Sequence, residues 1–197
     1  MIVTDIVKIK GKKKYEIYAD DELLVVLSDF GVVDCRIKRG VEVDDVMKER
    51  IEEALQADAF ETLLRIISST STTVSRAKRK LIEKGVDEKY VDNAVKKAQS
   101  YGYLNDKEYA VRAVESSKAK SRMRLRFEFS EKGVPSKYID RALEDFDEDS
   151  ACLQAVKKNI RRPLDDAEKR KFFAKLCNQG FSYDVVKRAY EEFIKEE

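Results

Sequence analysis

Histidine is absent from all 197 residues of the chain. Without an imidazole, neither a Ser-His-Asp nor a Cys-His catalytic arrangement can form, and no metal site with a histidine ligand is possible. The patterns G-x-x-x-x-G-K-[ST] and G-x-G-x-x-G, whose backbones hold nucleotide phosphates, are missing as well. The sequence therefore offers no positive evidence for an enzyme, a metal or a cofactor.

Cysteine is scarce, and long apolar runs are missing. Cys35, Cys152 and Cys177 are odd in number and far apart. They form neither a C-x-x-C pair nor a disulfide framework, which indicates a reducing cytoplasm. No apolar run approaches the roughly 20 residues of a membrane span, and the N-terminal stretch MIVTDIVKIKGKK shows no export signal. We expect a cytoplasmic monomer that has no contact with a membrane.

Only two prolines are present, whereas 40% of the residues are charged. This composition is typical of a soluble helical protein in which each helix buries one stripe and exposes the other. Most carboxylates, such as those of Asp44, Asp87 and Asp165, stand at expected helix starts or on exposed faces. We interpret them as caps and solvated side chains rather than as an acid–base pair.

The net charge of +2 conceals a basic middle third. Residues 1–73 carry a net charge of −4, residues 74–126 carry +8, and residues 127–197 carry −2. A nearly neutral protein with such a block can still present a surface that binds anions.

The same pattern of residues is written three times around Gly85, Gly133 and Gly180, which are 48 and 47 residues apart. Each glycine is expected at the left-handed position past a helix end, where a β-carbon would clash. Self-similarity at this period predicts stacked helical repeats. The residues expected to form the repeat core are Leu81, Gly85, Val91, Phe129, Gly133, Ile139, Leu176, Gly180 and Val186.

The rest of the chain fits around these repeats. Short alternating runs within residues 2–27 predict a two- or three-stranded antiparallel unit, followed by a short helix that Ser28 caps and that ends near Gly40. Asp44 is expected to cap a long helix that ends near Ser68. Further cap candidates are Thr73, Asp87, Ser136, and Asp165 or Asp166. Two more helices are expected to start at Asn105-Asp106 and near Asp147.

These elements predict a mainly α fold: tandem three-helix repeats in an elongated, curved array, with a small N-terminal antiparallel β unit. The expected boundaries are 1–43 for the β-containing extension, 44–73 for a long connecting helix and polar break, 74–121 for repeat one, 122–163 for repeat two, and 164–197 for an incomplete, two-helix repeat three.

The repeats resemble the RecX family of regulators of the bacterial RecA recombinase. The family elements K-L-x-x-K-G and G-Y/L-L/I-x-D-x-x-Y/F-A are similar to residues 80–85 and 102–110. Residues 124–134 and 175–183 are similar to the family's second and third repeats. The family opening Arg-Ser-x-x-Glu stands here as residues 72–76, TTVSR, without the arginine and the acid. A glycine often found before the second repeat is also missing around Ser121.

The resemblance implies a non-enzymatic regulator that binds the RecA–DNA filament and modulates RecA, with inhibition the expected direction. The alternative is an autonomous DNA-binding helical-repeat protein without sequence preference. The second helix of each repeat carries little positive charge, which argues against a recognition helix that reads bases.

The candidate partner-binding residues are the cations of the middle third. Alternate basic residues from Lys118 to Arg126 spread around an unbroken helix, but they converge if the backbone breaks near Ser121. Either a solvated face or a site for DNA phosphates or an acidic filament surface is consistent with them. The candidate site comprises Lys118, Lys120, Arg122, Arg124 and Arg126, with a smaller patch of Arg76, Lys78, Arg79 and Lys80. The expected partners are the RecA filament and, weakly, single- or double-stranded DNA.

Overall fold

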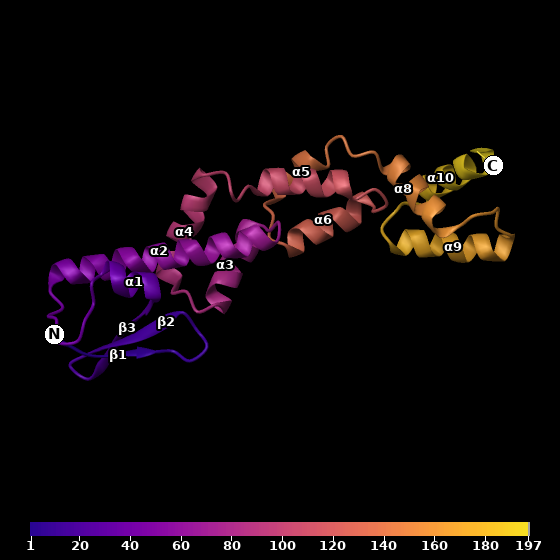
Figure 1. The fold of residues 1–197 in the computed structure, drawn as a ribbon. Helices are drawn as coiled ribbons and strands as arrows, with labels where there is room; N and C mark the ends of the chain where they lie inside the picture. The colour runs from indigo at the N-terminus through magenta and orange to yellow at the C-terminus, as the bar shows by residue number, and fades with distance from the viewer. Residues whose placement is uncertain (197) are drawn as a thin grey trace. The chain divides into compact units, whose positions relative to one another are not determined.

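The computed structural model describes residues 1–196 and divides them into two compact units. The first unit comprises residues 1–71 and 77–104, and the second comprises residues 72–76 and the chain from Asn105 onward. Figure 1 shows the ribbon from the N-terminal sheet to the C-terminal helices. The first unit contains β1 (Val3–Lys8), β2 (Lys14–Ala19), β3 (Glu22–Ser28), α1 (Asp29–Asp34), α2 (Asp45–Ser69), most of α3 (Val74–Glu83) and α4 (Glu88–Ser100).

The second unit holds the remaining helices, and its boundary with the first runs through α3, inside the predicted first repeat. The boundaries of the three repeats and the curved shape of their array therefore remain predictions from the sequence. The helices of this unit are α5 (Asp106–Ser116), α6 (Arg122–Glu131), α7 (Ser136–Ala142), α8 (Glu148–Asn159), α9 (Asp166–Asn178) and α10 (Tyr183–Glu196).

The N-terminal β unit is a three-stranded antiparallel sheet in the order β1-β2-β3. Its apolar face, which includes Val3, Ile17 and Leu27, packs in one core with Ile51 and Ala54 of α2. An isolated sheet of this size is marginal in water, so the long helix provides the surface that stabilises it. The predicted antiparallel unit is confirmed.

The short helix α1 begins as predicted but ends earlier. The Gly31 N–H donates to Ser28 Oγ at 3.0 Å, which confirms the cap. The predicted end near Gly40 is wrong, because Arg36 adopts a left-handed φ of 54° directly after the helix. The Ile37 N–H then donates back to the Val32 carbonyl oxygen at 3.1 Å and closes the helix.

The long helix α2 follows its predicted limits. Asp44 caps it by accepting the Met47 N–H at 2.7 Å. Helix α4 packs along α2 in the first unit, and the Tyr90 hydroxyl donates to Glu52 Oε2 at 2.7 Å. Tyr90 is therefore a core residue with a satisfied hydroxyl, rather than an exposed ring for base stacking.

The three repeat glycines end their helices in the same way. Gly85, Gly133 and Gly180 have φ values of 77°, 71° and 94°. In each case the glycine N–H donates to the carbonyl three residues earlier, and the next N–H donates to the carbonyl five residues earlier. The residues four before these glycines, namely Leu81, Phe129 and Leu176, are all at most 1% exposed.

The middle of the second unit is a core in which Ala110 of α5, Phe129 of α6 and Ile139 of α7 pack together. The prediction that Ser136 caps α7 is wrong. Pro135 occupies the N-cap position, where its carbonyl oxygen accepts the Tyr138 N–H at 2.9 Å, and no side-chain capping bond forms. Pro135 therefore directly precedes Ser136, the first residue of the helix, and takes the capping position in place of the predicted serine.

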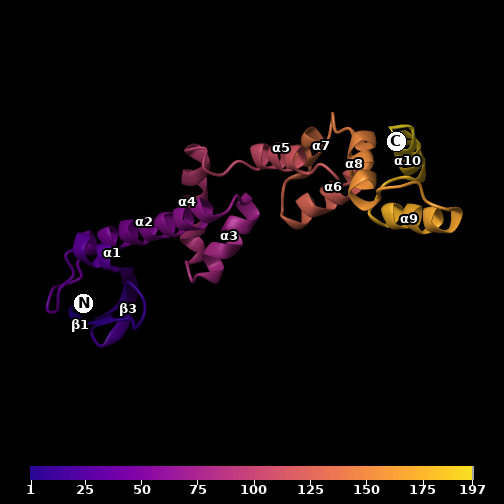
Figure 2. The same ribbon diagram turned by 45° about the vertical axis from the view of Figure 1, so that its right-hand side comes forward.

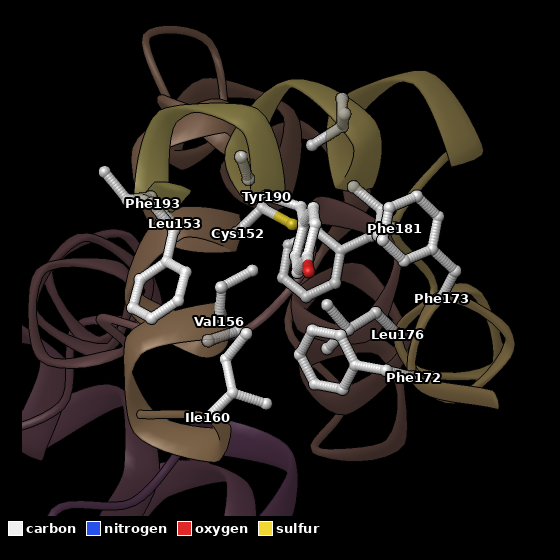
Figure 3. Close-up of a cluster of buried hydrophobic side chains, with 14 of the residues drawn as sticks. Cys152, Leu153, Val156, Ile160, Phe172, Phe173, Leu176, Phe181, Tyr190 and Phe193 are labelled. Atoms are coloured by element: carbon white, nitrogen blue, oxygen red, sulfur yellow. The ribbon is translucent and has the colours of Figure 1, made fainter. Parts of the chain in front are cut away.

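The C-terminal helices share a second core, in which α8 packs on α10 (Figures 1 and 2). Figure 3 shows Cys152 and Val156 of α8 facing Leu176 and Tyr190 of α9 and α10. Burial raises the pKa of the Cys152 thiol to about 12, so this cysteine is an apolar core residue at neutral pH. Among residues 1–196, no helix combines the length and the apolar character needed to cross a membrane.

Candidate anion-binding groove

Two similar joints within the second unit connect the start of one helix to the glycine-terminated end of another. At the first, Thr73 caps α3 by accepting the Arg76 N–H at 3.3 Å, as predicted. Its hydroxyl also donates to the Lys132 carbonyl oxygen at 2.5 Å, directly before Gly133. Asp106, the first residue of α5, accepts the Val74 N–H at 2.9 Å. A carboxylate distant in sequence thus takes part in capping α3.

The second joint repeats this arrangement at α6. Ser121 caps α6 by accepting the Arg124 N–H at 3.1 Å, and its hydroxyl donates to the Gln179 carbonyl oxygen at 2.7 Å, directly before Gly180. Glu148, the first residue of α8, accepts the Arg122 N–H at 3.0 Å. The segment 117–121 between α5 and α6 is therefore held against α8 and α9 at its C-terminal end.

The side chain of Arg122 takes part in the same joint. Its guanidinium donates to the carbonyl oxygens of Leu143 and, at 2.8 Å, of Phe146, past the end of α7. The guanidinium carbon also lies 5.7 Å from the centre of the Phe146 ring. The Leu143 carbonyl also accepts the Phe146 N–H at 3.3 Å, so Arg122 adds a second donor to it past the end of α7. The Arg122 side chain is half-buried.

The backbone break near Ser121 places two of the predicted cations in a groove. Lys118 and Lys120 of the 117–121 segment line a hollow of about 750 Å³ together with Lys157 and Lys158 of the last turn of α8 and with Arg161, which follows the C-cap of that helix. The other lining residues are small or uncharged, and none carries a carboxylate: Ser116, Ser117, Ala119 and Gln154. We call these nine residues the basic groove.

The cations of the basic groove differ in their ion pairs. Lys120 pairs with Glu128 at 2.6 Å, and Lys157 pairs with Glu196 at 2.5 Å. Among residues 1–196, no ion pair involves Lys118, Lys158 or Arg161. These three side chains are all exposed, and they leave the groove with positive charge that is not neutralised locally.

Outside the groove, the remaining arginines of α6 are paired. Arg124 donates to Glu128 at 3.0 Å beside Lys120, and Arg126 pairs with Asp140 at 2.7 Å. Burial raises the pKa of Glu128, but the hydrogen bonds and charges of Lys120 and Arg124 outweigh it and hold the pKa below its usual value. The predicted block from Lys118 to Arg126 is therefore divided: two lysines in the groove, one arginine in the joint, and two arginines in surface ion pairs.

None of the four residues of the smaller patch on α3 lines the basic groove, and three of them belong to the first unit. Lys78 pairs with Asp92 at 2.6 Å and Arg79 with Glu83 at 3.5 Å. Lys80 lines a separate hollow of about 520 Å³ within the first unit, together with Arg65 and Lys84. Arg76 is exposed on the first turn of α3.

Sequence reasoning missed Lys157, Lys158 and Arg161. They lie in the stretch KKNIRR at the end of α8, within a part of the chain whose net charge is −2. The available signal was the local charge of these six residues, which cover the last turn of α8 and the residues directly after it. No group of histidine, cysteine, aspartate or glutamate residues in the described part of the chain could hold a metal ion.

The repeated helices and the N-terminal sheet place the chain in a class, that of helical-repeat proteins with a small β extension. Within this class it is similar to proteins named Regulatory protein RecX. One from Clostridium botulinum (strain Eklund 17B / Type B) is 27% identical over 199 residues, covering 94% of this chain and 92% of the relative. Another, from Caldanaerobacter subterraneus subsp. tengcongensis, is 25% identical and covers 96% of this chain and 98% of the relative. The resemblance expected from the repeats is confirmed.

Solved structures share the fold. A regulatory protein RecX aligns with a TM-score of 0.62 and 24% identity, covering 100% of this chain and 99% of the other. RecX from Lactobacillus salivarius aligns with a TM-score of 0.61 and 20% identity, covering 70% and 96% of the two chains. The predicted fold class, mainly α with a small N-terminal sheet, is confirmed. No family model matches the chain.

Proposed function

We propose that the protein regulates a RecA-type recombinase by binding the RecA–DNA filament and inhibiting the recombinase. The observation that carries this proposal is the similarity to Regulatory protein RecX over 94% of the chain and 92% of the relative. A likeness that covers both chains almost completely supports a shared regulatory role. It also supports a mechanism of binding without turnover, since the relatives are named regulators.

The positive charge of the basic groove also supports the proposal. A RecA–DNA filament carries phosphates and acidic side chains, and a cationic surface is attracted to either. We propose that Lys118 and Lys120 meet the filament together with Lys157, Lys158 and Arg161. Arg124 and Arg126 form a secondary contact, and the α3 patch of Arg76, Lys78, Arg79 and Lys80 forms another. Arg122 acts indirectly, because it holds the joint beside the groove.

Co-sedimentation tests filament binding directly. RecA filaments are assembled on single-stranded DNA with a slowly hydrolysed ATP analogue and then pelleted with the protein. We expect the protein in the pellet with filaments, and in the supernatant with recombinase that lacks DNA and nucleotide. If the protein stays in the supernatant under both conditions, the proposed function is wrong.

A further inference from the structure

We propose that the basic groove binds the phosphodiester backbone of nucleic acid, without contacts to the bases. This inference deepens the proposed function, because it names what the groove contacts on the filament. Direct binding to DNA is nevertheless measured without recombinase, so the two proposals can fail separately.

The charge of the groove favours phosphate as its ligand. Five cations line it and no carboxylate does, and three of the cations, Lys118, Lys158 and Arg161, have no ion pair within residues 1–196. Four of the five are lysines, which act as point charges and suit the rotating oxygens of successive phosphates.

The uncharged lining residues favour a nucleic-acid backbone over both bases and protein. No aromatic side chain lines the groove, so it offers no platform on which bases could stack. It also lacks the large aromatic or aliphatic anchors that dominate protein–protein affinity. Gln154, which is exposed, can donate its amide to a phosphate oxygen. Contacts limited to phosphate position a strand without reading its sequence.

The joint beside the groove holds its two walls in place. On one side, Ser121 and Arg122 attach the 117–121 segment to Gln179, Glu148 and the end of α7. On the other side, α8 is held by its buried face, including Cys152 and Val156. The lysine backbones therefore keep their spacing before a ligand binds, which reduces the entropy cost of binding.

The test is fluorescence anisotropy with labelled oligothymidylate and a mixed-sequence strand, across a range of salt concentrations. The groove variant reverses the three unpaired cations: Lys118→Glu, Lys158→Glu and Arg161→Glu. The control variant makes the same change in net charge at three exposed lysines of the second unit that do not line the groove: Lys107→Glu, Lys137→Glu and Lys171→Glu. Circular dichroism verifies that each variant is folded.

For wild type, we expect similar affinity for both strands. Each phosphate contact contributes roughly 0.7 to the slope of log K against log salt on single strands. The groove variant should therefore lose at least about tenfold in affinity at low salt and about 2 in slope, whereas the control should lose less than about threefold.

Equal losses in the groove and control variants would overturn the proposal, because the attraction would then be a property of net charge. The proposal would also be overturned if the groove variant bound DNA as tightly as the wild-type protein does. If that variant fails instead to pellet with filaments, the groove contacts the recombinase protein. Conversely, groove-dependent DNA binding without co-sedimentation of wild type would refute the proposed function and leave this inference standing.

Discussion

The helix end at Gly85 and the helix ends at Gly133 and Gly180 have the same backbone but different surroundings. All three glycines are left-handed and close their helices with the same pair of hydrogen bonds. A β-carbon at Gly133 would lie 2.4 Å from Ser75 Cβ, and one at Gly180 would lie 2.6 Å from Ser121 Oγ. A β-carbon at Gly85 would meet nothing within 4 Å.

This difference separates two reasons for a glycine at a helix end. At Gly85 the reason is conformational, because the left-handed backbone disfavours a side chain. At Gly133 and Gly180 there is a second reason, because residues at the start of another helix, Ser75 of α3 and Ser121 before α6, pack directly on the glycine. The same local sequence is thus used once as an open helix end and twice as a joint, and the joint at Gly180 positions the basic groove.

The largest expected effect is that of Gly133→Ala. The added methyl group costs about 1–2 kcal/mol for the left-handed backbone and a further 1–3 kcal/mol, roughly, for overpacking against Ser75. Gly85→Ala should show only the first of these costs. Urea unfolding of both variants measures the difference. If the two substitutions destabilise the protein equally, packing at the joint contributes nothing, and the comparison fails.

A smaller effect is expected for Thr73→Val, which preserves the shape of a fully buried side chain. The change removes the cap of α3 and leaves the Lys132 carbonyl without its donor, at a cost of about 1–3 kcal/mol. The neighbouring Thr72→Val is the control, because Thr72 makes no side-chain hydrogen bond within residues 1–196. It should change the unfolding free energy by less than about 0.5 kcal/mol. Equal effects at the two positions would show that the hydroxyl bond to Lys132 is dispensable.

The smallest expected effect is a pH dependence at Asp106. Burial raises the pKa of its carboxyl, and the hydrogen bond from the Val74 N–H offsets this only in part. Because the folded pKa lies above the unfolded one, the folded state binds the proton more tightly. Wild type should therefore gain stability relative to Asp106→Asn as the pH falls through the folded pKa towards the usual value of 3.8. Chemical unfolding at neutral pH and near pH 4 measures this gain. A loss of relative stability on acidification would contradict the raised pKa.

Local signals made much of the fold predictable. Asp44, Thr73 and Asp87 are polar residues directly before apolar helical patterns, and all three cap helices as expected. The prediction failed where a residue did something unusual for its type. Arg36 adopts a left-handed conformation that only glycine or asparagine commonly signals, and it ends α1 early.

The basic groove could be predicted only in part. The break near Ser121 could be predicted from the neighbouring residues, and it separates Lys118 and Lys120 from the arginines of α6. The other side of the groove is formed by Lys157, Lys158 and Arg161, which lie almost 40 residues later in the sequence. They come close to Lys118 and Lys120 only in the folded chain, where Ser121 is hydrogen-bonded to the Gln179 carbonyl oxygen. Arg122 illustrates the same limit, since only the fold shows that its charge serves two backbone carbonyls.

Titration of the protein into RecA-catalysed ATP hydrolysis on single-stranded DNA tests the central claim most directly. A regulator that acts by binding the filament should lower the hydrolysis rate in proportion to its occupancy, with the effect saturating below one chain per recombinase. The groove variant should require markedly higher concentrations, whereas the control variant should behave like wild type. Unchanged hydrolysis in the presence of excess folded wild-type protein would contradict the proposed regulation.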